Sequence, residues 1–130
     1  MNVRTLSAGE HIPEGFNTGY EKMPVQGDWI WVAEKDGIAT GVLMVAPCHG
    51  LIYLMRLCVK KGSPTIVAFL LLRECMRETR RRGFKGFFTH IDPTGEIDRR
   101  ILQTCRKSGG VQMLIPQVML VGSIERAARY

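Results

Sequence analysis

The sequence predicts a single α/β (α+β) domain, in which a mixed and mostly antiparallel central sheet carries a long central helix and a second, C-terminal helix. Three observations support this fold class. Apolar, β-rich segments separated by tight turns fill residues 29–59, as in an antiparallel meander. An amphipathic segment of helical period follows at residues 64–82, and another apolar segment follows at residues 84–91. A strand, a crossover helix and a strand in this order predict one parallel pair.

Composition limits the class of protein. The 130 residues fit one domain, and a hydrophobic content of 45% is enough for a core. The formal net charge of +6 favours an anionic partner, such as a nucleic acid, an acidic membrane surface or a phosphorylated cofactor. No apolar run reaches the ~18 residues of a membrane span, and the first residues lack the apolar stretch of a signal peptide. We therefore expect a cytoplasmic protein without a membrane partner.

The cysteines predict neither a disulfide framework nor a metal site. Cys48, Cys58, Cys75 and Cys105 are scattered, form no C-x-x-C pair, and each lies in an apolar or helical run. This pattern is typical of buried thiols in a reducing compartment. We expect no bound metal.

The N-terminal region, residues 1–28, is predicted to be reduced and irregular. Residues 3–7 fit a short first strand. Residues 8–26 contain prolines and glycines without a helical period, which indicates a loop with at most one helical turn. A segment of this length without regular structure is often functional.

Three strands should follow. Trp29–Glu34 and Ile38–Ala46 are joined by Asp36-Gly37, a dipeptide typical of tight hairpin turns. A second turn at Pro47–Gly50 leads to Leu51–Val59. That strand is apolar almost throughout, which predicts a central strand covered on both faces.

The central helix is predicted from Pro64 to just before Gly83. Ser63 suits the N-cap, because its hydroxyl can accept from the free N–H groups of the first turn. Pro64 has the right φ for the first helical position, and Gly83 suits the C-terminal cap. Glu74 and Glu78 can pair with the arginines three or four residues later.

Beyond the helix, Phe84–Ile91 should form a strand parallel to Leu51–Val59. A second helix is predicted from Glu96 to about Lys107, with one apolar face made by Ile97, Ile101, Leu102 and Cys105. Val111–Val121 reads as one bent strand or two short ones.

Four segments of this sequence resemble the GCN5-related N-acetyltransferase (GNAT) superfamily. WVAEKDGIATGVLMV is similar to its second and third strands, and IYLMRLCV to its fourth. FLLLRECMRETRRRGFKGFFTHID is similar to its central helix and fifth strand, and ILQTCRKSGG to its next helix. The resemblance covers roughly three-quarters of the chain. The small size is similar to that of reduced members in phage and bacterial genomes.

The resemblance implies transfer of an acetyl group from acetyl-coenzyme A to an amine, carried by an unknown small molecule or protein. It implies that the fourth strand binds the pantetheine arm through its backbone, at Leu57, Cys58 and Val59. It also implies that the following loop holds the pyrophosphate, through amides of Gly62, Ser63, Thr65 and Ile66 and the charges of Lys60 and Lys61. The helix N-terminus favours an anion on physical grounds. The alternative is an ordinary helix start at Ser63.

The catalytic candidates are His90, Tyr53 and Cys105. His90 lies near the end of the fifth strand and could take a proton from the amine; alternatively it is bonded to the following turn. Tyr53 could position the acceptor, or pack on the sheet. Cys105 stands where the family commonly has its general-acid Tyr; alternatively it is a buried thiol. No carboxylate lies in Leu51–Val59, where many members carry a Glu base.

Other functions stay open. The changed positions and a loop with one glycine motivate a catalytically inactive GNAT-fold module for binding or assembly. A basic nucleic-acid-binding domain is the third hypothesis, but the cluster Arg80–Arg82 lacks interleaved aromatic residues, so we expect a solvated helix end and no nucleic acid. Trp29 and Trp31 should anchor the core rather than line a pocket. Glu34 and Asp36 should be solvated. A homo-oligomer is left open.

Overall fold

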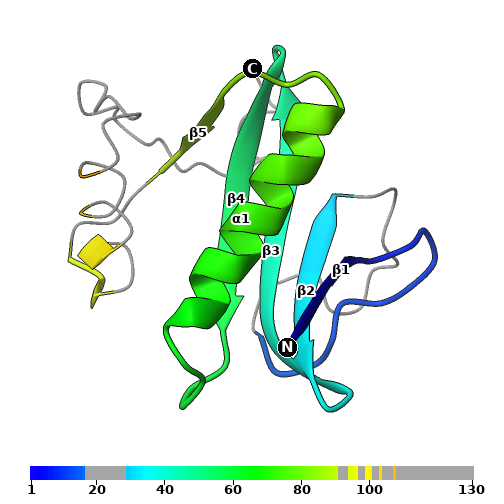
Figure 1. Ribbon diagram of the computed structural model, residues 1–130, viewed down its shortest axis with the longest axis vertical. Helices are drawn as coiled ribbons and strands as arrows, with labels where there is room; N and C mark the ends of the chain where they lie inside the picture. Colours follow the sequence, from blue (N-terminus) through cyan, green and yellow to red (C-terminus); the bar gives the residue numbers. More distant parts are fainter. Residues whose placement is uncertain (17–28, 91–93, 97–98, 101–102, 104–106, 108–130) are drawn as a thin grey trace, which may run out of the picture. The chain divides into compact units, whose positions relative to one another are not determined.

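The computed structural model describes residues 1–16, 29–90, 94–96, 99–100, 103 and 107. Within these ranges the chain forms five strands and one long helix (Figure 1). The elements are β1 (Asn2–Thr5), β2 (Ile30–Lys35), β3 (Ile38–Cys48), β4 (Leu51–Val59), α1 (Ile66–Arg81) and β5 (Phe87–Thr89). All of them belong to one compact unit, Met1–His90. A second unit comprises Ile91–Tyr130, and the single domain expected from the sequence stays a prediction.

The sheet confirms the predicted topology. Its order is β1-β2-β3-β4-β5, with three antiparallel pairs and a parallel pairing of β4 with β5. The turn at Asp36-Gly37 has φ angles of 52° and 78°, which a two-residue hairpin of type I′ requires. His49-Gly50 makes an equivalent turn, with φ angles of 50° and 78°. The predicted turn therefore starts too early, because Pro47 and Cys48 still pair in β3.

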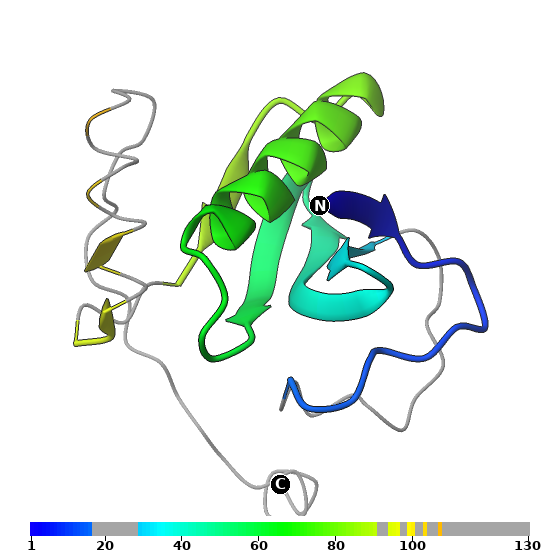
Figure 2. The same cartoon turned by 60° about the horizontal axis from the view of Figure 1, so that its bottom comes forward.

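α1 covers one face of the sheet (Figure 2). Its buried residues Val67, Leu71 and Cys75 pack with Trp31, Ala33, Leu43, Val45 and Ile52. Trp31 is only 2% exposed, and Trp29 packs on the same cluster. The prediction that the two tryptophans anchor the core is confirmed.

The two ends of α1 differ from each other. At the C-terminus, Gly83 has φ 98° and its N–H donates to the Arg80 carbonyl at 3.0 Å. Phe84 N–H donates to the Thr79 carbonyl at 3.0 Å, which completes a Schellman motif. At the N-terminus the prediction is wrong. The N-cap position is Thr65, not Ser63, and no side chain caps it.

β5 is shorter than predicted, and the helix end explains why. The N–H of Phe84 is used by the Schellman motif, and its ring packs edge-on against Trp29 at 5.9 Å between centroids. The chain therefore joins the sheet only near Gly86, whose carbonyl accepts from Ile52 N–H at 3.0 Å. Three residues then pair with β4.

The face of the sheet opposite α1 is covered by the N-terminal segment. Leu6, Ile12 and Phe16 are at most 8% exposed and pack on Ile30, Val32, Val42 and Met44. The sequence suggests no more than an irregular loop here, because three apolar residues at uneven spacing show no period. The described part of this loop thus supplies the second half of the core.

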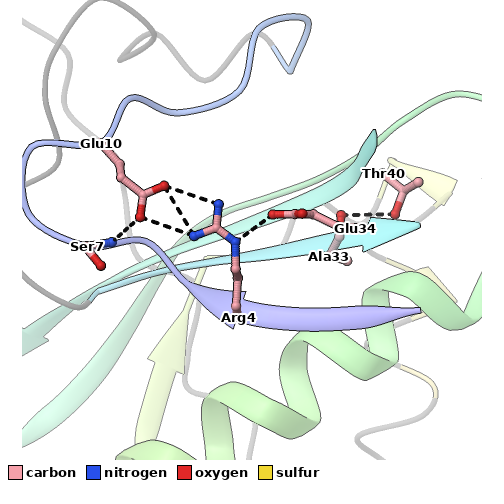
Figure 3. Close-up of polar contacts among 6 residues, drawn as sticks. All are labelled: Arg4, Ser7, Glu10, Ala33, Glu34 and Thr40. Atoms are coloured by element: carbon pink, nitrogen blue, oxygen red, sulfur yellow. Dashed lines mark hydrogen bonds and ion pairs between the residues drawn. The ribbon is translucent and has the colours of Figure 1, made fainter. Parts of the chain in front are cut away.

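Arg4 holds this segment to the edge of the sheet (Figure 3). Its Nε donates to Glu34 Oε1 at 2.7 Å, and its Nη atoms donate to the Glu10 carboxylate at 3.2 Å. Glu10 also accepts from Ser7 N–H at 2.8 Å. Glu34 is therefore paired rather than simply solvated, which corrects the expectation from sequence. Nearby, Thr40 is the extra residue of a bulge opposite β2, and its hydroxyl donates to the Ala33 carbonyl.

The remaining described residues agree with a second helix. Glu96, Arg99, Arg100, Gln103 and Lys107 are helical and exposed, at the spacing of one polar face. The apolar positions predicted for that helix, and the strand predicted at Val111–Val121, lie outside the described residues. No helix in the part of the chain that the structure describes is long and apolar enough to cross a membrane.

We predict that Gly41→Ala lowers the free energy of unfolding by about 1–3 kcal/mol, the usual cost of overpacking. A Cβ at Gly41 would lie 2.8 Å from Val67 Cγ1 and 2.8 Å from Leu71 Cδ1, and both side chains are 0% exposed. Denaturant unfolding measures the loss. The matched control is Gly86→Ala, whose Cβ would meet only the half-exposed Leu51 at 3.0 Å. Equal stabilities of the two variants would contradict the prediction.

A second prediction concerns Arg4→Gln. The guanidinium of Arg4 and the N–H of Ser7 hold the pKa of the Glu10 carboxyl below its usual range. A lowered pKa gives stability that is present above the ordinary pKa and is lost as the pH falls through the lowered value. The variant should therefore be less stable than the wild type at neutral pH, and the difference should vanish in acid.

Carboxyl NMR titration of the Arg4→Gln variant should show the pKa of Glu10 rising toward its ordinary value. Arg77→Gln is the matched control, since Arg77 pairs only with Glu74 among the described residues. An unmoved Glu10 titration in Arg4→Gln would contradict the pairing.

Candidate functional site

β4 contains one extra residue, and this changes which way the strand faces. Met44 pairs with Arg56, but Val45 pairs with Leu54, so Met55 is the additional residue of a β-bulge. Before the bulge, Ile52 and Leu54 pack on the α1 side; after it, Leu57 and Val59 do. The bulge therefore shifts by one residue the alternation of β4 side chains between the two faces of the sheet.

The same shift turns the peptide groups of β4. Ile52 N–H donates to Gly86, and the Leu54 carbonyl accepts from Thr89 Oγ1 at 2.9 Å, so these even-numbered residues face β5. Beyond the bulge, Lys60 N–H donates to Thr40 of the β3 side at 2.8 Å. By the alternation of an antiparallel ladder, the peptide groups of Leu57 and Val59 point away from β3, toward the side where β5 lies.

Among the described residues, the ladder between β4 and β5 does not continue past the bulge. Its last pair is Leu54 with Thr89, and β5 ends there. Among the predicted pantetheine-binding residues, Leu57 and Val59 therefore present their backbone on this side of β4. The backbone of Cys58, between them, takes the orientation of Lys60, toward β3.

The loop after β4 is a tight turn that leads into α1. Ser63 N–H donates to the Lys60 carbonyl at 3.0 Å, and Gly62 has φ 86°, the conformation that a type II turn needs at its third position. Pro64 has no N–H, and its carbonyl accepts from Val67 N–H at 3.1 Å. The amides of Thr65 and Ile66 belong to the first turn, where helices lack intrahelical acceptors.

The electrostatics of this loop favour an anion. Lys60 and Lys61 are exposed, and the first turn of α1 contains no acidic residue that would compete at the positive end of the helix dipole. Of the six loop residues predicted to bind pyrophosphate, Ser63 is the one whose amide is already bonded within the loop. The donor set fits a phosphate group, although through fewer amides than a glycine-rich loop presents.

Two predicted catalytic residues lie in contact. Tyr53 on β4 and His90, directly after β5, are joined by a hydrogen bond of 3.0 Å between Tyr53 Oη and His90 Nδ1. The Tyr53 ring stacks on Phe88 at 4.9 Å between centroids. The parallel register places Tyr53 opposite Phe88, so the pairing of β4 with β5 creates the contact. Sequence reasoning named both residues but missed that they meet.

The other candidates lie elsewhere. Cys105 lies outside the described residues. Cys75 is buried, and burial raises the pKa of its thiol to about 12; among the described residues neither Cys75 nor Cys48 forms a disulfide. Within the described ranges, no three His, Cys, Asp or Glu residues gather to hold a metal ion. A shallow depression beside the β2–β3 turn is lined by residues 1–2 and 34–37 and includes neither Tyr53 nor His90.

The arginines at the end of α1 are largely engaged with carboxylates. Glu78 pairs with Arg81 at 2.6 Å and with Arg82 at 3.1 Å, as the i, i+3 and i, i+4 spacing predicted. These contacts lower the pKa of Glu78. Arg82 also lies over the Trp29 ring at 4.9 Å, a cation–π contact. Arg80 and Arg81 are exposed, as expected from sequence, but Arg82 is half-buried against the tryptophan, which corrects the expectation that the whole cluster is solvated.

Comparison with solved structures identifies the fold. An aminoglycoside N-acetyltransferase in complex with CoA is 16% identical, with TM-score 0.58 over 72% of this chain and 75% of that chain. An aminoglycoside acetyltransferase from an uncultured soil metagenomic sample, in complex with sisomicin, is 17% identical, with TM-score 0.53 over 72% and 65%. A ribosomal-protein-alanine N-acetyltransferase from Brucella melitensis is 20% identical, with TM-score 0.50 over 62% and 51%.

This protein therefore has the GNAT fold, and the resemblance found in the sequence is confirmed at the level of the fold. At such low identity the likeness identifies the fold alone. No protein-family model matches the chain, and no curated protein matches it.

Proposed function

We propose that this protein transfers an acetyl group from acetyl-coenzyme A to an amine. One observation carries the proposal. The bulge at Met55 turns the backbone of Leu57 and Val59 away from β3, directly before a basic turn and the N-terminus of a long helix. In a protein of this fold, that sequence of features offers an extended hydrogen-bonding edge followed by an anion site.

The donor would lie along the end of β4. The peptide groups of Leu57 and Val59 would bond the amides of the pantetheine arm. Lys60 and Lys61, with the amides of Gly62, Thr65 and Ile66, would hold the pyrophosphate, while Ser63 would share an amide already bonded in the turn. A solved neighbour of the same fold is described in complex with CoA, which supports this donor.

The chemistry requires an amine without its proton, a polarised carbonyl and a proton acceptor. The N–H of Leu57, turned toward the same side of β4 and farther from the pyrophosphate loop than Val59, would polarise the thioester carbonyl. His90, next to the end of β5, would accept the proton of the attacking amine. General base catalysis of this kind typically contributes about 10²–10⁴-fold to the rate.

The acceptor is proposed only as a class, an amine of a small molecule or of a protein. The solved neighbours include one described in complex with sisomicin and one described as a ribosomal-protein-alanine N-acetyltransferase. These two acceptor types differ in size and charge. We therefore use both as test substrates and do not expect either one in particular to be the natural acceptor.

A second candidate function is a catalytically inactive module that binds through the same fold. The observation that favours it is the loop, since the Ser63 amide is occupied and Pro64 has none. Such a module would bind coenzyme A weakly or not at all and would turn over no acetyl-CoA. The two candidates are therefore separated by binding and turnover.

We predict that acetyl-CoA stabilises the protein. At a ligand concentration ~100-fold above the dissociation constant, the gain should be about 2.7 kcal/mol, seen as a rise in Tm. Release of the coenzyme A thiol should accelerate on addition of sisomicin, of a peptide that begins with alanine, or of a simple alkylamine. A Tm unchanged at millimolar acetyl-CoA would overturn coenzyme binding, and a shift without thiol release would favour the inactive module.

A second prediction distinguishes the effect of the loop's conformation on stability from its effect on ligand binding. Gly62→Ala and Gly9→Ala both place a side chain at positive φ, 86° and 90°, with no atom within 4 Å of the new Cβ. Each should cost roughly 1–2 kcal/mol of stability. Only Gly62→Ala should weaken the binding of acetyl-CoA, because only this substitution distorts the turn before α1. Equal dissociation constants for the two variants, by titration calorimetry, would remove the loop from the binding site.

A further inference from the structure

The bulge brings Arg56 next to Tyr53 on the face of the sheet opposite α1. Tyr53 pairs with Ala46 of β3. Arg56 pairs with Met44, which belongs to the apolar cluster on that face. Residues two apart on a strand share a face, and so do directly opposite residues of neighbouring strands. Tyr53 and Arg56 therefore occupy adjacent positions of this face, roughly 7 Å apart along β4.

The same face continues onto β5, at the contact between Tyr53 and His90. The Tyr53 ring stacks on Phe88 at 4.9 Å between centroids, and Tyr53 Oη is hydrogen-bonded to His90 Nδ1 at 3.0 Å. His90 and Arg56 are both exposed. The other face of β4 and β5 packs under α1 (Figure 2), through Ile52, Leu54 and Phe87. An acceptor amine would therefore reach His90 over the face to which Arg56 belongs.

The charges along this part of the chain are positive. No Asp or Glu occurs between Asp36 and Glu74. None occurs between Glu78 and Asp92 either. β3, β4, β5, the loop after β4 and the first half of α1 therefore contain no carboxylate, and the charged residue of β4 is Arg56. Among the described residues, no carboxylate lies within ion-pair distance of its guanidinium.

The described N-terminal segment, which covers the same face over β2 and β3, does not change this balance. Its Glu10 is held by Arg4 of β1, at the opposite edge of the sheet from β5. Its Glu14 is exposed to solvent, on a stretch that packs over β2 and β3. The described part of the chain thus offers Arg56 no carboxylate partner, and a bound anion would supply one.

We propose that Arg56 binds an anionic group of the acceptor, so that the acceptor is a small amine that carries a carboxylate or a phosphate. The inference rests on the acetyl transfer proposed above and names the class of its substrate. A guanidinium binds either anion through two parallel hydrogen bonds. The same positive charge, followed by Lys60 and Lys61 and offset by no carboxylate, would repel an acceptor with several amino groups.

The pairing would also help the amine to react. A neutral amine is the form that attacks the thioester. A carboxylate on the same small molecule stabilises the ammonium form and raises the pKa of the amine. A guanidinium paired with that carboxylate offsets this effect. Arg56 would thus orient the acceptor across Tyr53 toward His90 and make the amine easier to deprotonate.

The phosphates of the donor have a different place. Their proposed site is the turn Lys60–Ser63 and the first turn of α1, and α1 packs on the other face of the sheet. The side chain of Arg56 lies on the face opposite α1. Substitution of Arg56 should therefore leave the dissociation constant of acetyl-CoA unchanged and act on the acceptor.

The test compares four small primary amines as acceptors. β-Alanine and β-alaninamide have the same length and differ by one negative charge. O-Phosphoethanolamine carries a phosphate instead of the carboxylate, and 1,3-diaminopropane carries a second cation. The KM of the better anionic amine should be about tenfold lower than that of β-alaninamide, the usual worth of a hydrogen bond to a charged group, and 1,3-diaminopropane should be the poorest acceptor. The better of the two anionic amines identifies which anion Arg56 prefers.

The variants assign this preference to Arg56. In Arg56→Gln, the ratio of kcat/KM for β-alanine to kcat/KM for β-alaninamide should fall about tenfold. This ratio cancels the different basicities of the two amines when it is compared between proteins at one pH. Arg56→Lys should retain part of the preference, because an ammonium keeps the charge without the bidentate geometry. Arg73→Gln, which removes the same charge from an exposed position on α1, is the matched control and should keep the wild-type ratio. An unchanged Tm checks that each variant is folded.

The outcomes separate the inference from the function on which it rests. Acetyl transfer with the same ratio in the wild type and in Arg56→Gln overturns the role of Arg56 alone. Acetyl transfer to 1,3-diaminopropane in preference to both anionic amines, or to none of the four amines, overturns the substrate class. A wild type that does not bind acetyl-CoA overturns the transferase. NMR titration of the Arg56 Nε–H signal with β-alanine and with O-phosphoethanolamine then decides the anion site by itself, since a signal that neither compound moves overturns it.

Discussion

One extra residue in β4, Met55, sets the orientation of everything that follows it in the site. Without the bulge, strict alternation would turn Arg56 toward α1, in phase with Ile52 and Leu54, and bury its charge in a cluster of apolar side chains. An unpaired charge in such a place is costly. With the bulge, Leu57 and Val59 occupy that face instead, and Arg56 is exposed. Met55 therefore allows apolar side chains to fill the face toward α1. It also orients the backbone of Leu57 and Val59, which would bind acetyl-CoA in the proposed function.

The close approach of α1 to the sheet depends on a second small detail. Gly41 leaves room for Val67 and Leu71, and this position on β3 lies opposite Val59 of β4. The helix N-terminus is thereby held near the end of β4, where the loop of Lys60–Ser63 must span only a short distance. A tight turn suffices, which explains why the loop is brief and contains a single glycine at positive φ.

The fold was largely predictable, and the site only in part. The order of strands, the parallel pair and the helix end at Gly83 follow from periodicity and turn residues, which act locally. The helix start was misplaced because Ser63 lies in the tight turn that its N–H closes with the Lys60 carbonyl, and the regular helix begins only at Ile66. The bulge was missed because β4 is apolar on both sides, although the phase of Arg56 was a usable signal. The Tyr53–His90 contact joins residues 37 positions apart, and only the register of β4 against β5 brings them together.

The loop after β4 and the contact between Tyr53 and His90 are fixed by different parts of the structure. The Lys60 and Lys61 side chains are exposed. At an ionic strength of about 0.1 M, salt largely screens their attraction for a phosphate at distances beyond about 10 Å. Two first-turn amides and a helix dipole act at shorter range and are fixed in direction. Coenzyme affinity would thus draw on charges outside the sheet, whereas the contact between Tyr53 and His90 is fixed by the register of β4 and β5. The loop of residues 60–63 can therefore change without disturbing the contact between Tyr53 and His90.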